Sequence, residues 1–162
     1  MPQIDEWIAL YRSTNPTVRL RAAEALLRRP KEVPLRLLLD IFLAKREGVL
    51  HVDPGKALMQ CADPELVPEM IALLNSEDRF VRATACDVLG NAGDYIATPH
   101  LLRMLDDPEW MVRWRAGFAL ASLKDSSARE QLRSIYERRK NDEYNIVWAI
   151  RCALQALGET TS

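Results

Sequence analysis

Aromatic side chains recur at helical spacing in the last third of the chain. Two sets have members four residues apart: Trp110, Trp114 and Phe118, then Tyr144, Trp148 and Cys152. Residues four apart lie on the same face of an α-helix, so each set predicts one stripe of side chains. Exposed Trp and Tyr side chains supply much of the binding energy at protein interfaces. The chemistry that these residues offer is therefore the binding of a partner.

Arginine side chains lie next to both stripes in the sequence. Arg113 and Arg115 flank Trp114, and Arg151 directly precedes Cys152. A guanidinium group binds a carboxylate through two parallel hydrogen bonds, so the predicted surface could receive an acidic group beside an apolar one. A structural interpretation stays open, because the last helices could fold over the stripes or the aromatic side chains could pack as an end cap.

Little in the sequence predicts catalysis. His51 and His100 lie in different repeat units, with no carboxylate or cysteine at a ligand spacing from them. Cys61, Cys86 and Cys152 have no close pair spacing, which argues against a disulfide framework and a zinc site. Cys61 and Cys86 map to the predicted packed face, and Cys152 to the accessible one. We therefore expect no enzyme, no metal and no cofactor.

The elements that position these residues follow from a repeat of about 32 residues. Five apolar residues each lie eight positions before a leucine: Val18, Leu50, Val81, Val112 and Ile146 precede Leu26, Leu58, Leu89, Leu120 and Leu154. Such a period indicates stacked helical hairpins, none of which buries its apolar face alone. The sequence predicts an all-α solenoid of five hairpins in a single domain, 1–162. The units are expected at about 4–33, 34–66, 67–97, 98–127 and 128–159.

Charged residues repeat with the same period. Three aspartates lie thirteen positions after the first apolar residue of their units: Asp63, Asp94 and Asp125. A carboxylate there can cap the first helix of the next unit or bridge to an arginine. The expected bridging partners directly follow the valine of their units: Arg19, Arg82 and Arg113. We expect these residues to form a structural ladder.

Two segments resemble a known family. Val81-Arg-Ala-Thr-Ala-Cys-Asp-Val-Leu-Gly90 and Val112-Arg-Trp-Arg-Ala-Gly-Phe-Ala-Leu120 are similar to HEAT repeats, in the short form of the phycobilisome-lyase-like repeat family. The resemblance covers nearly the whole chain, more weakly in units two and five. It implies a right-handed superhelix whose second helices line the concave side. Most members are adaptors and some assist the attachment or removal of bilin pigments, so the resemblance alone implies no particular reaction.

Two segments depart from the repeat. In the second unit Pro54, followed by Gly55, takes a position that alanine holds in the neighbouring units, so we expect its second helix to begin late, capped by Asp53, and to end near Ala62. The segment 48–55 is interpreted either as a bend in the solenoid or as a partner contact. Residues 138–143 predict a solvated basic loop in the fifth unit.

Composition limits the classes of partner. The 162 residues carry a net charge of -1, and residues 51–107 hold ten acidic against four basic side chains. This balance gives no reason to expect nucleic acid or an anionic membrane. No apolar run reaches the roughly 20 residues of a membrane span. Because the first residues lack the features of a secretory signal, the cytoplasm is the expected location.

Three functional hypotheses follow. The leading one is a non-catalytic scaffold or adaptor whose concave aromatic groove holds a helix or loop of another protein. Its expected contacts are Trp110, Trp114, Phe118, Tyr144, Trp148, Arg115 and Arg151. The second is a bilin-handling accessory protein or phycobilin lyase subunit, with a tetrapyrrole-bearing protein as partner. The third is nucleic-acid binding, against which the acidic middle of the chain argues.

Overall fold

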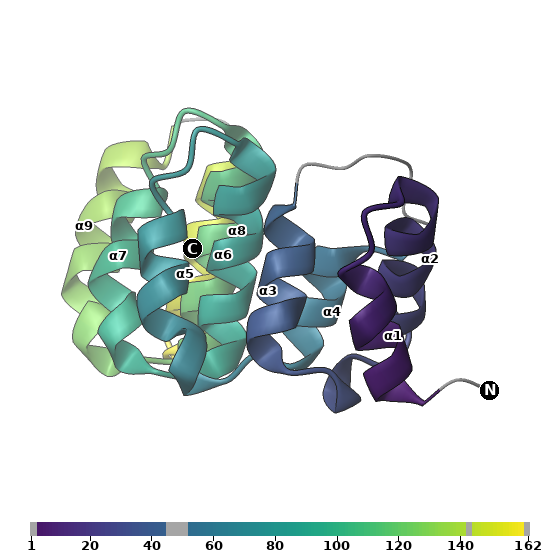
Figure 1. Cartoon of the computed structure of the whole chain (residues 1–162). Coiled ribbons are helices and arrows are strands. Elements are labelled where there is room, and N and C mark those ends of the chain that lie inside the picture. The colour runs from purple at the N-terminus through teal and green to yellow at the C-terminus, as the bar shows by residue number, and fades with distance from the viewer. Residues whose placement is uncertain (1–2, 45–51, 142–143, 161–162) are drawn as a thin grey trace. The chain divides into compact units, whose positions relative to one another are not determined.

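The computed structural model describes residues 3–44, 52–141 and 144–160. Within these ranges the chain consists of α-helices joined by turns and short 3-10 helices, without any strand (Figure 1). The all-α prediction is therefore confirmed. The chain divides into two compact regions, an N-terminal region at Met1–Cys61 and a C-terminal region at Ala62–Ser162. The expectation of one domain over 1–162 stays a prediction.

The N-terminal region contains two helical hairpins. Their helices are α1 (Ile4–Tyr11) with α2 (Pro16–Leu27), and α3 (Leu35–Leu43) with α4 (Pro54–Gln60). As expected, α4 begins late: Pro54 is its first residue, and the Asp53 carboxylate accepts a hydrogen bond from the Gly55 backbone N–H at 2.9 Å. The helix ends at Gln60, two residues before the predicted end. Leu50, His51 and the rest of 48–51 lie outside the described residues, so the first half of the 48–55 segment is not described.

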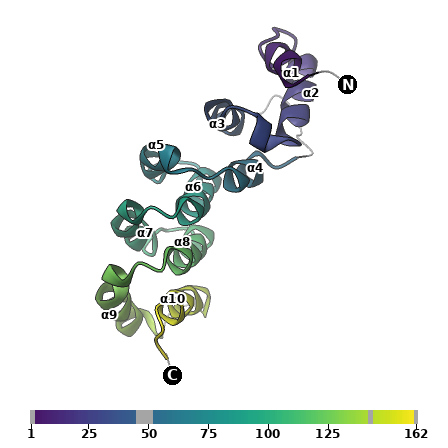
Figure 2. The ribbon, with the colours of Figure 1, turned by 90° about the horizontal axis from the view of Figure 1, so that it is seen from below.

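The C-terminal region contains three hairpins and carries the aromatic stripes. Its helices are α5 (Val67–Leu73), α6 (Arg79–Ala92), α7 (Thr98–Met104), α8 (Trp110–Leu123), α9 (Arg129–Arg139) and α10 (Tyr144–Ala156). Within this region α5, α7 and α9 form one layer and α6, α8 and α10 the other (Figure 2). The helix α8 packs between α6 and α10. This second layer positions the candidate site.

The predicted basic loop at 138–143 is partly wrong. Arg138 and Arg139 belong to the last turn of α9, and Lys140 follows as its C-terminal cap. Arg139 forms an ion pair with Asp106, which precedes α8. Because this contact bridges two hairpins, it favours a longer helix than local sequence indicates. Residues 142–143 lie outside the described residues.

The repeated leucines form the core. Leu26, Leu58 and Leu89 have no exposed surface, and Leu120 and Leu154 are at most 3% exposed. Burying one such side chain stabilises the fold by about 1.5–3 kcal/mol. Within the second layer, glycine permits close helix contact: a Cβ atom at Gly117 of α8 would lie 2.5 Å from the Ala149 Cβ of α10. Small residues thus set how closely the second helices approach.

The repeated aspartates act as caps. Asp63, Asp94 and Asp125 each accept a hydrogen bond from the backbone N–H two residues later, at 2.9 to 3.0 Å. Each begins a 3-10 helix that leads directly into the first helix of the next hairpin. The sequence allowed these aspartates either to cap the next helix or to bridge to an arginine, and the structure shows that they cap.

The repeated arginines hold the turns of their own hairpins. Arg19 donates to the backbone carbonyls of Ser13 and Thr14, at 2.8 and 3.0 Å. Arg82 and Arg113 make the corresponding contacts, each to the two carbonyls at the same place in its own turn, at 2.8 to 3.1 Å. Buried or half-buried turn carbonyls need such donors. The arginines therefore fix the angle between the two helices of a hairpin.

The prediction that Arg82 pairs with one of the repeated aspartates is wrong. The Arg82 guanidinium pairs with Asp107, through bonds of 2.8 and 3.0 Å to its two carboxylate oxygens. Asp107 belongs to the turn of the next hairpin and also accepts from the Glu109 backbone N–H. Its distance in sequence from Arg82 does not match the repeated aspartates, which explains why the periodic pattern did not indicate it. The pair links neighbouring hairpins.

Candidate functional site

The aromatic stripes meet across α8 and α10. Trp114 and Trp148 occupy equivalent positions in the repeat, two residues after Val112 and Ile146. Their rings stack with centroids 4.9 Å apart and an angle of 16° between planes. Phe118 is tilted against both, at 5.1 Å from Trp114 and 5.3 Å from Trp148. Such contacts contribute about 0.5–1.5 kcal/mol each beyond the burial of their area.

Exposure divides the five aromatic residues into two groups. Trp114, Phe118 and Trp148 are half-buried because they cover one another. Trp110 is 53% exposed and Tyr144 is 75% exposed, although both are large and aromatic. We name these five residues the aromatic surface. Mutual packing explains the positions of Trp114, Phe118 and Trp148. It does not explain why Trp110 and Tyr144 are so exposed.

Charged side chains lie beside the aromatic surface. Arg115 of α8 forms an ion pair with Asp87 of α6 at 3.0 Å. The Asp87 side chain is only 13% exposed. Burial raises the pKa of this carboxyl group to about 6, and the attraction of Arg115 only partly offsets this effect. Arg79 of α6 forms a longer pair with Glu109, at 3.4 Å.

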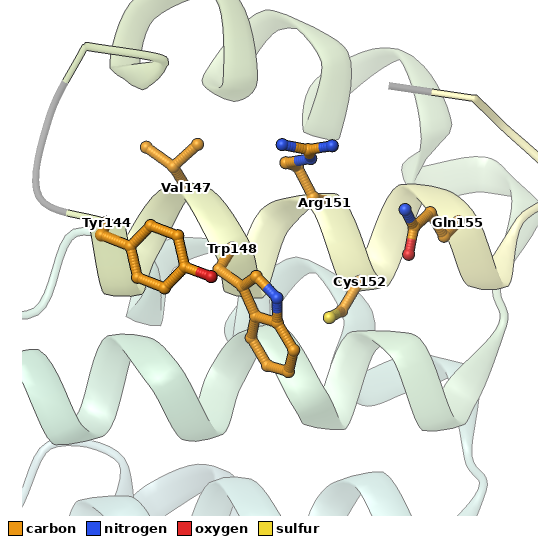
Figure 3. A pocket seen from close by; sticks show the side chains of 6 residues that line it. All are labelled: Tyr144, Val147, Trp148, Arg151, Cys152 and Gln155. Carbon is orange, nitrogen blue, oxygen red and sulfur yellow. The ribbon is translucent and has the colours of Figure 1, made fainter. Parts of the chain in front are cut away.

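A hollow of about 290 Å³ adjoins the aromatic surface on α10. It is lined by Tyr144, Val147, Trp148, Arg151, Cys152 and Gln155 (Figure 3). Trp148 points towards the neighbouring helix α8, whereas Val147 and Arg151 project from the opposite side of α10. The lining therefore combines apolar surface with polar groups, among them the Tyr144 hydroxyl and the Arg151 guanidinium.

The structure brings together most of the predicted contacts. Trp110, Trp114, Phe118 and Arg115 lie on α8, and Tyr144, Trp148 and Arg151 lie on α10. Arg113 is directed differently: it donates to the Asp107 and Pro108 carbonyls at 2.9 Å, so it serves the turn before α8. The binding role of the seven residues and the concave groove remain predictions.

Sequence reasoning missed Asp87 as part of this site. The repeat register could have found it, because Asp87 lies six positions after Val81, as Phe118 and Cys152 do after their own starts. Its ion pair with Arg115 places one acidic group next to the aromatic surface. The hollow on α10 had no sequence signal, since its shape depends on the contacts of several side chains.

The cysteines differ from one another in burial. Cys86 is fully buried, as expected, and burial raises the pKa of its thiol. Cys61 was expected in the packed face but is half-buried at the end of α4. Cys152 is half-buried beside the hollow; burial raises the pKa of its thiol, while Arg151 acts in the opposite direction. A raised pKa disfavours the reactive thiolate form.

Among the described residues, no group of three His, Cys, Asp or Glu side chains could hold a metal ion. No helix in these ranges combines the length and apolar character that crossing a membrane requires. His100, a half-buried residue, has its Nδ1 atom 2.8 Å from the Arg103 guanidinium.

Comparisons with known proteins agree with the repeat pattern. Residues 55–113 match the family model described as HEAT repeats, and residues 112–138 match the PBS lyase HEAT-like repeat. No curated protein matches the chain. The crystal structure of an engineered protein, a Northeast Structural Genomics Consortium target, is similar with a TM-score of 0.56 and 17% identity, over 97% of this chain and 80% of that one. At this identity the likeness shows the fold alone, an α-solenoid. The two family matches identify the chain as a HEAT-repeat protein whose recognised repeats span residues 55–138.

Proposed function

We propose that this protein is a non-catalytic scaffold that holds another protein on the aromatic surface of α8 and α10. The observation that carries the proposal is the exposure of Trp110 and Tyr144, at 53% and 75%, beside the stacked pair of Trp114 and Trp148. Leaving such side chains in water costs free energy that a partner recovers by covering them. The HEAT repeats support the same class of function, because helical-repeat proteins commonly present extended binding surfaces.

The partner contacts are expected to divide into two kinds. Trp110 and Tyr144 are exposed enough to be buried anew by a partner, so they are the expected energetic anchors. Trp114, Phe118 and Trp148 form a preordered floor, which spares the partner the cost of fixing their rotamers. Arg115, which is paired with Asp87, and Arg151 lie on the same two helices and are expected at the edge of the contact.

Affinity capture from the native host tests this proposal. The bait is the full chain, compared with the double variant Trp110→Ala/Tyr144→Ala. Because both side chains are exposed, the variant should keep its helical content and lose the captured protein. Tyr95→Ala is the matched control, since Tyr95 is 57% exposed but lies in the 3-10 helix before α7. Equal capture by the wild type and the double variant would remove the aromatic surface as the binding site.

A bilin-handling role is the second candidate, and it has one specific observation in its favour. The match to the PBS lyase HEAT-like repeat begins at residue 112 and includes Trp114 and Phe118. Flat indole rings could stack against a tetrapyrrole. Titration with phycocyanobilin should then produce induced circular dichroism that Trp114→Ala abolishes. A featureless titration would leave only the protein-binding proposal.

A further inference from the structure

The first turns of α6, α8 and α10 each carry an exposed aromatic side chain. Phe80 is the second residue of α6, Trp110 the first of α8 and Tyr144 the first of α10. Phe80 is 59% exposed, a property that it shares with Trp110 and Tyr144. The three helices lie side by side and start at equivalent points of the repeat, so these residues form one row across three hairpins (Figure 2). We name them the aromatic row.

Ring faces in this row are left uncovered by other rings. One helical turn further along, Trp114 and Trp148 stack on each other at 4.9 Å. Among the described residues, by contrast, neither Trp110 nor Tyr144 has another aromatic ring in contact. An uncovered ring face is a good packing surface for the flat, apolar ring of a proline residue.

Close packing of the second helices sets the spacing of the aromatic row. A Cβ atom at Gly90 of α6 would lie 2.7 Å from the Ala119 Cα of α8, and one at Gly117 of α8 would lie 2.5 Å from the Ala149 Cβ of α10. Helices in contact have axes about 8–10 Å apart. One turn of a polyproline II helix, which is three residues, advances about 9 Å. Every third side chain of such a segment would therefore meet the next member of the row.

Hydrogen-bond donors in the aromatic row favour the same occupant. Trp110 carries an indole N–H group and Tyr144 a phenolic O–H group. A polyproline II segment has no internal hydrogen bonds, so its backbone carbonyls can accept from both donors. The carbonyls of an α-helix, except those of its last turn, already accept from the helix itself. The row therefore suits an extended proline-rich segment better than a helix.

The turn before α6 carries an excess of negative charge. Glu77 and Asp78 are both exposed there. The Arg82 guanidinium reaches the same turn and donates to its carbonyls, but it is paired with Asp107. The charge of Arg82 is thus balanced, and the two exposed carboxylates attract a cationic side chain of a partner.

The aromatic ring next to this turn can pack against a cation. The carbon atom of the Arg79 guanidinium lies 5.1 Å from the centroid of the Phe80 ring. Arg79 is balanced by Glu109, with which it pairs at 3.4 Å. Because Phe80 is more than half exposed, its ring can also receive the side chain of a partner's lysine or arginine. The α6 end of the aromatic row therefore favours a basic residue.

We propose that the aromatic row binds a proline-rich segment of the partner in the polyproline II conformation, with prolines at Tyr144 and Trp110 and a lysine or arginine at Phe80. Glu77 and Asp78 supply the complementary charge at that end. Such a segment is largely ordered before it binds, so binding costs little conformational entropy. The inference rests on the proposed function, because Trp110 and Tyr144 are its expected anchors.

Two displayed peptide libraries, selected in parallel on the full chain, test the proposal. One library has proline fixed at every third position, and the other consists of helical peptides with one randomised face. The proline library should yield the binders, with Lys or Arg enriched on one side of the prolines. In fluorescence anisotropy with a purified peptide, Trp110→Ala should weaken binding at least about tenfold, equivalent to about 1.4 kcal/mol. Trp110→Phe should weaken it less, because it removes the N–H donor and keeps a ring.

A charge reversal tests the α6 end of the aromatic row. Glu77→Lys should weaken binding of the basic peptide about threefold, as expected for an exposed ion pair. Replacing the basic residue of the peptide by glutamate should restore binding to this variant. Glu65→Lys is the matched control, because Glu65 is also exposed but lies in the 3-10 helix before α5. Equal effects of Glu77→Lys and Glu65→Lys would overturn the placement of a basic residue at Phe80.

The outcomes separate this inference from the proposed function. Binders that need Trp110 and Tyr144 but come only from the helical library would overturn the inference and leave the proposed function intact. Binders that keep their affinity when alanine replaces their prolines would do the same. If neither library yields a binder sensitive to Trp110→Ala/Tyr144→Ala, both are contradicted. Circular dichroism and urea unfolding of each variant establish that it is folded.

Discussion

The helices α8 and α10 share one repeat register but face different surroundings. Each places a tryptophan two positions after its start, and the two rings stack on each other. Five positions after the start they diverge, because α8 has Gly117 in close contact with α10, whereas α10 has Arg151 beside a hollow. The comparison teaches that this repeat position holds a glycine where two second helices touch closely, and that a long charged side chain takes the same position on α10.

The largest loss of stability is expected at the buried ion pair that joins α6 to the turn before α8. Arg82 and Asp107 are paired with side chains only 11% and 4% exposed. Arg82→Met leaves Asp107 as a buried, uncompensated charge, so we expect a loss of about 3–5 kcal/mol in the free energy of unfolding. Urea denaturation measures this loss.

Arg79→Met is the matched control for that prediction. Arg79 pairs with Glu109 at 3.4 Å, and the two side chains are 53% and 38% exposed. Such an exposed pair contributes about 1 kcal/mol or less. Equal losses in the free energy of unfolding for Arg82→Met and Arg79→Met would contradict the distinction between the buried and the exposed ion pair.

The next effect depends on pH and concerns the buried carboxyl group of Asp87. Its pKa in the folded protein is about 6, against an ordinary value of 3.8, so between these pH values the folded state binds more protons than the unfolded state. Stability conferred by Asp87 therefore falls as the pH rises from about 4 to 6, by up to about 3 kcal/mol.

Urea unfolding at pH 4 and pH 7 checks the contribution of Asp87. Asp87→Asn should be more stable relative to the wild type at pH 7 than at pH 4. Asp40→Asn, at an exposed position on α3, serves as the control substitution. If the free energies of unfolding of Asp87→Asn and the wild type differed by the same amount at pH 4 and pH 7, the assigned role of burial would be contradicted.

A smaller effect is expected at the contact of α8 with α10. Gly-to-Ala substitution inside a helix usually stabilises it by up to about 1 kcal/mol. At Gly117 the added methyl group would collide with Ala149, so we expect a destabilisation of about 1–3 kcal/mol instead. Thermal or urea unfolding gives the sign directly. A stabilised Gly117→Ala variant would show that the two helices separate easily.

The smallest effect on stability is expected at the equivalent position of α10. Arg151→Ala should lower the free energy of unfolding by about 1 kcal/mol or less, because the side chain is half-buried and its truncation forces no backbone apart. A loss of stability as large as that of Gly117→Ala would mean that Arg151 holds α10 in place.

Much of the fold followed from the sequence because the hairpin signals are local and repeated. The leucines that recur at the repeat period are buried, and Asp53 and Pro54 begin α4 as their residue types indicate. The failures involve contacts between hairpins. Asp107 as the partner of Arg82, and Arg139 as a helical residue paired with Asp106, depend on residues brought together only by stacking.

The candidate site was predictable in part for the same reason. Helical spacing placed Trp114 and Trp148 in corresponding positions on α8 and α10, where they stack. Spacing does not reveal which of the aromatic side chains stay exposed, because exposure depends on the mutual covering of Trp114, Phe118 and Trp148. The role of Asp87 and the hollow beside Arg151 likewise depend on neighbouring helices.

The central claim is that the aromatic surface of α8 and α10 binds a partner, and the indole N–H signals in a nuclear magnetic resonance spectrum test it most directly. The chain has four tryptophans, of which Trp110, Trp114 and Trp148 belong to this surface and Trp7 lies on α1. Adding the captured partner should shift the signals of Trp110, Trp114 and Trp148 and leave that of Trp7 unchanged. Binding that shifts only Trp7, or no indole signal at all, would contradict the claim.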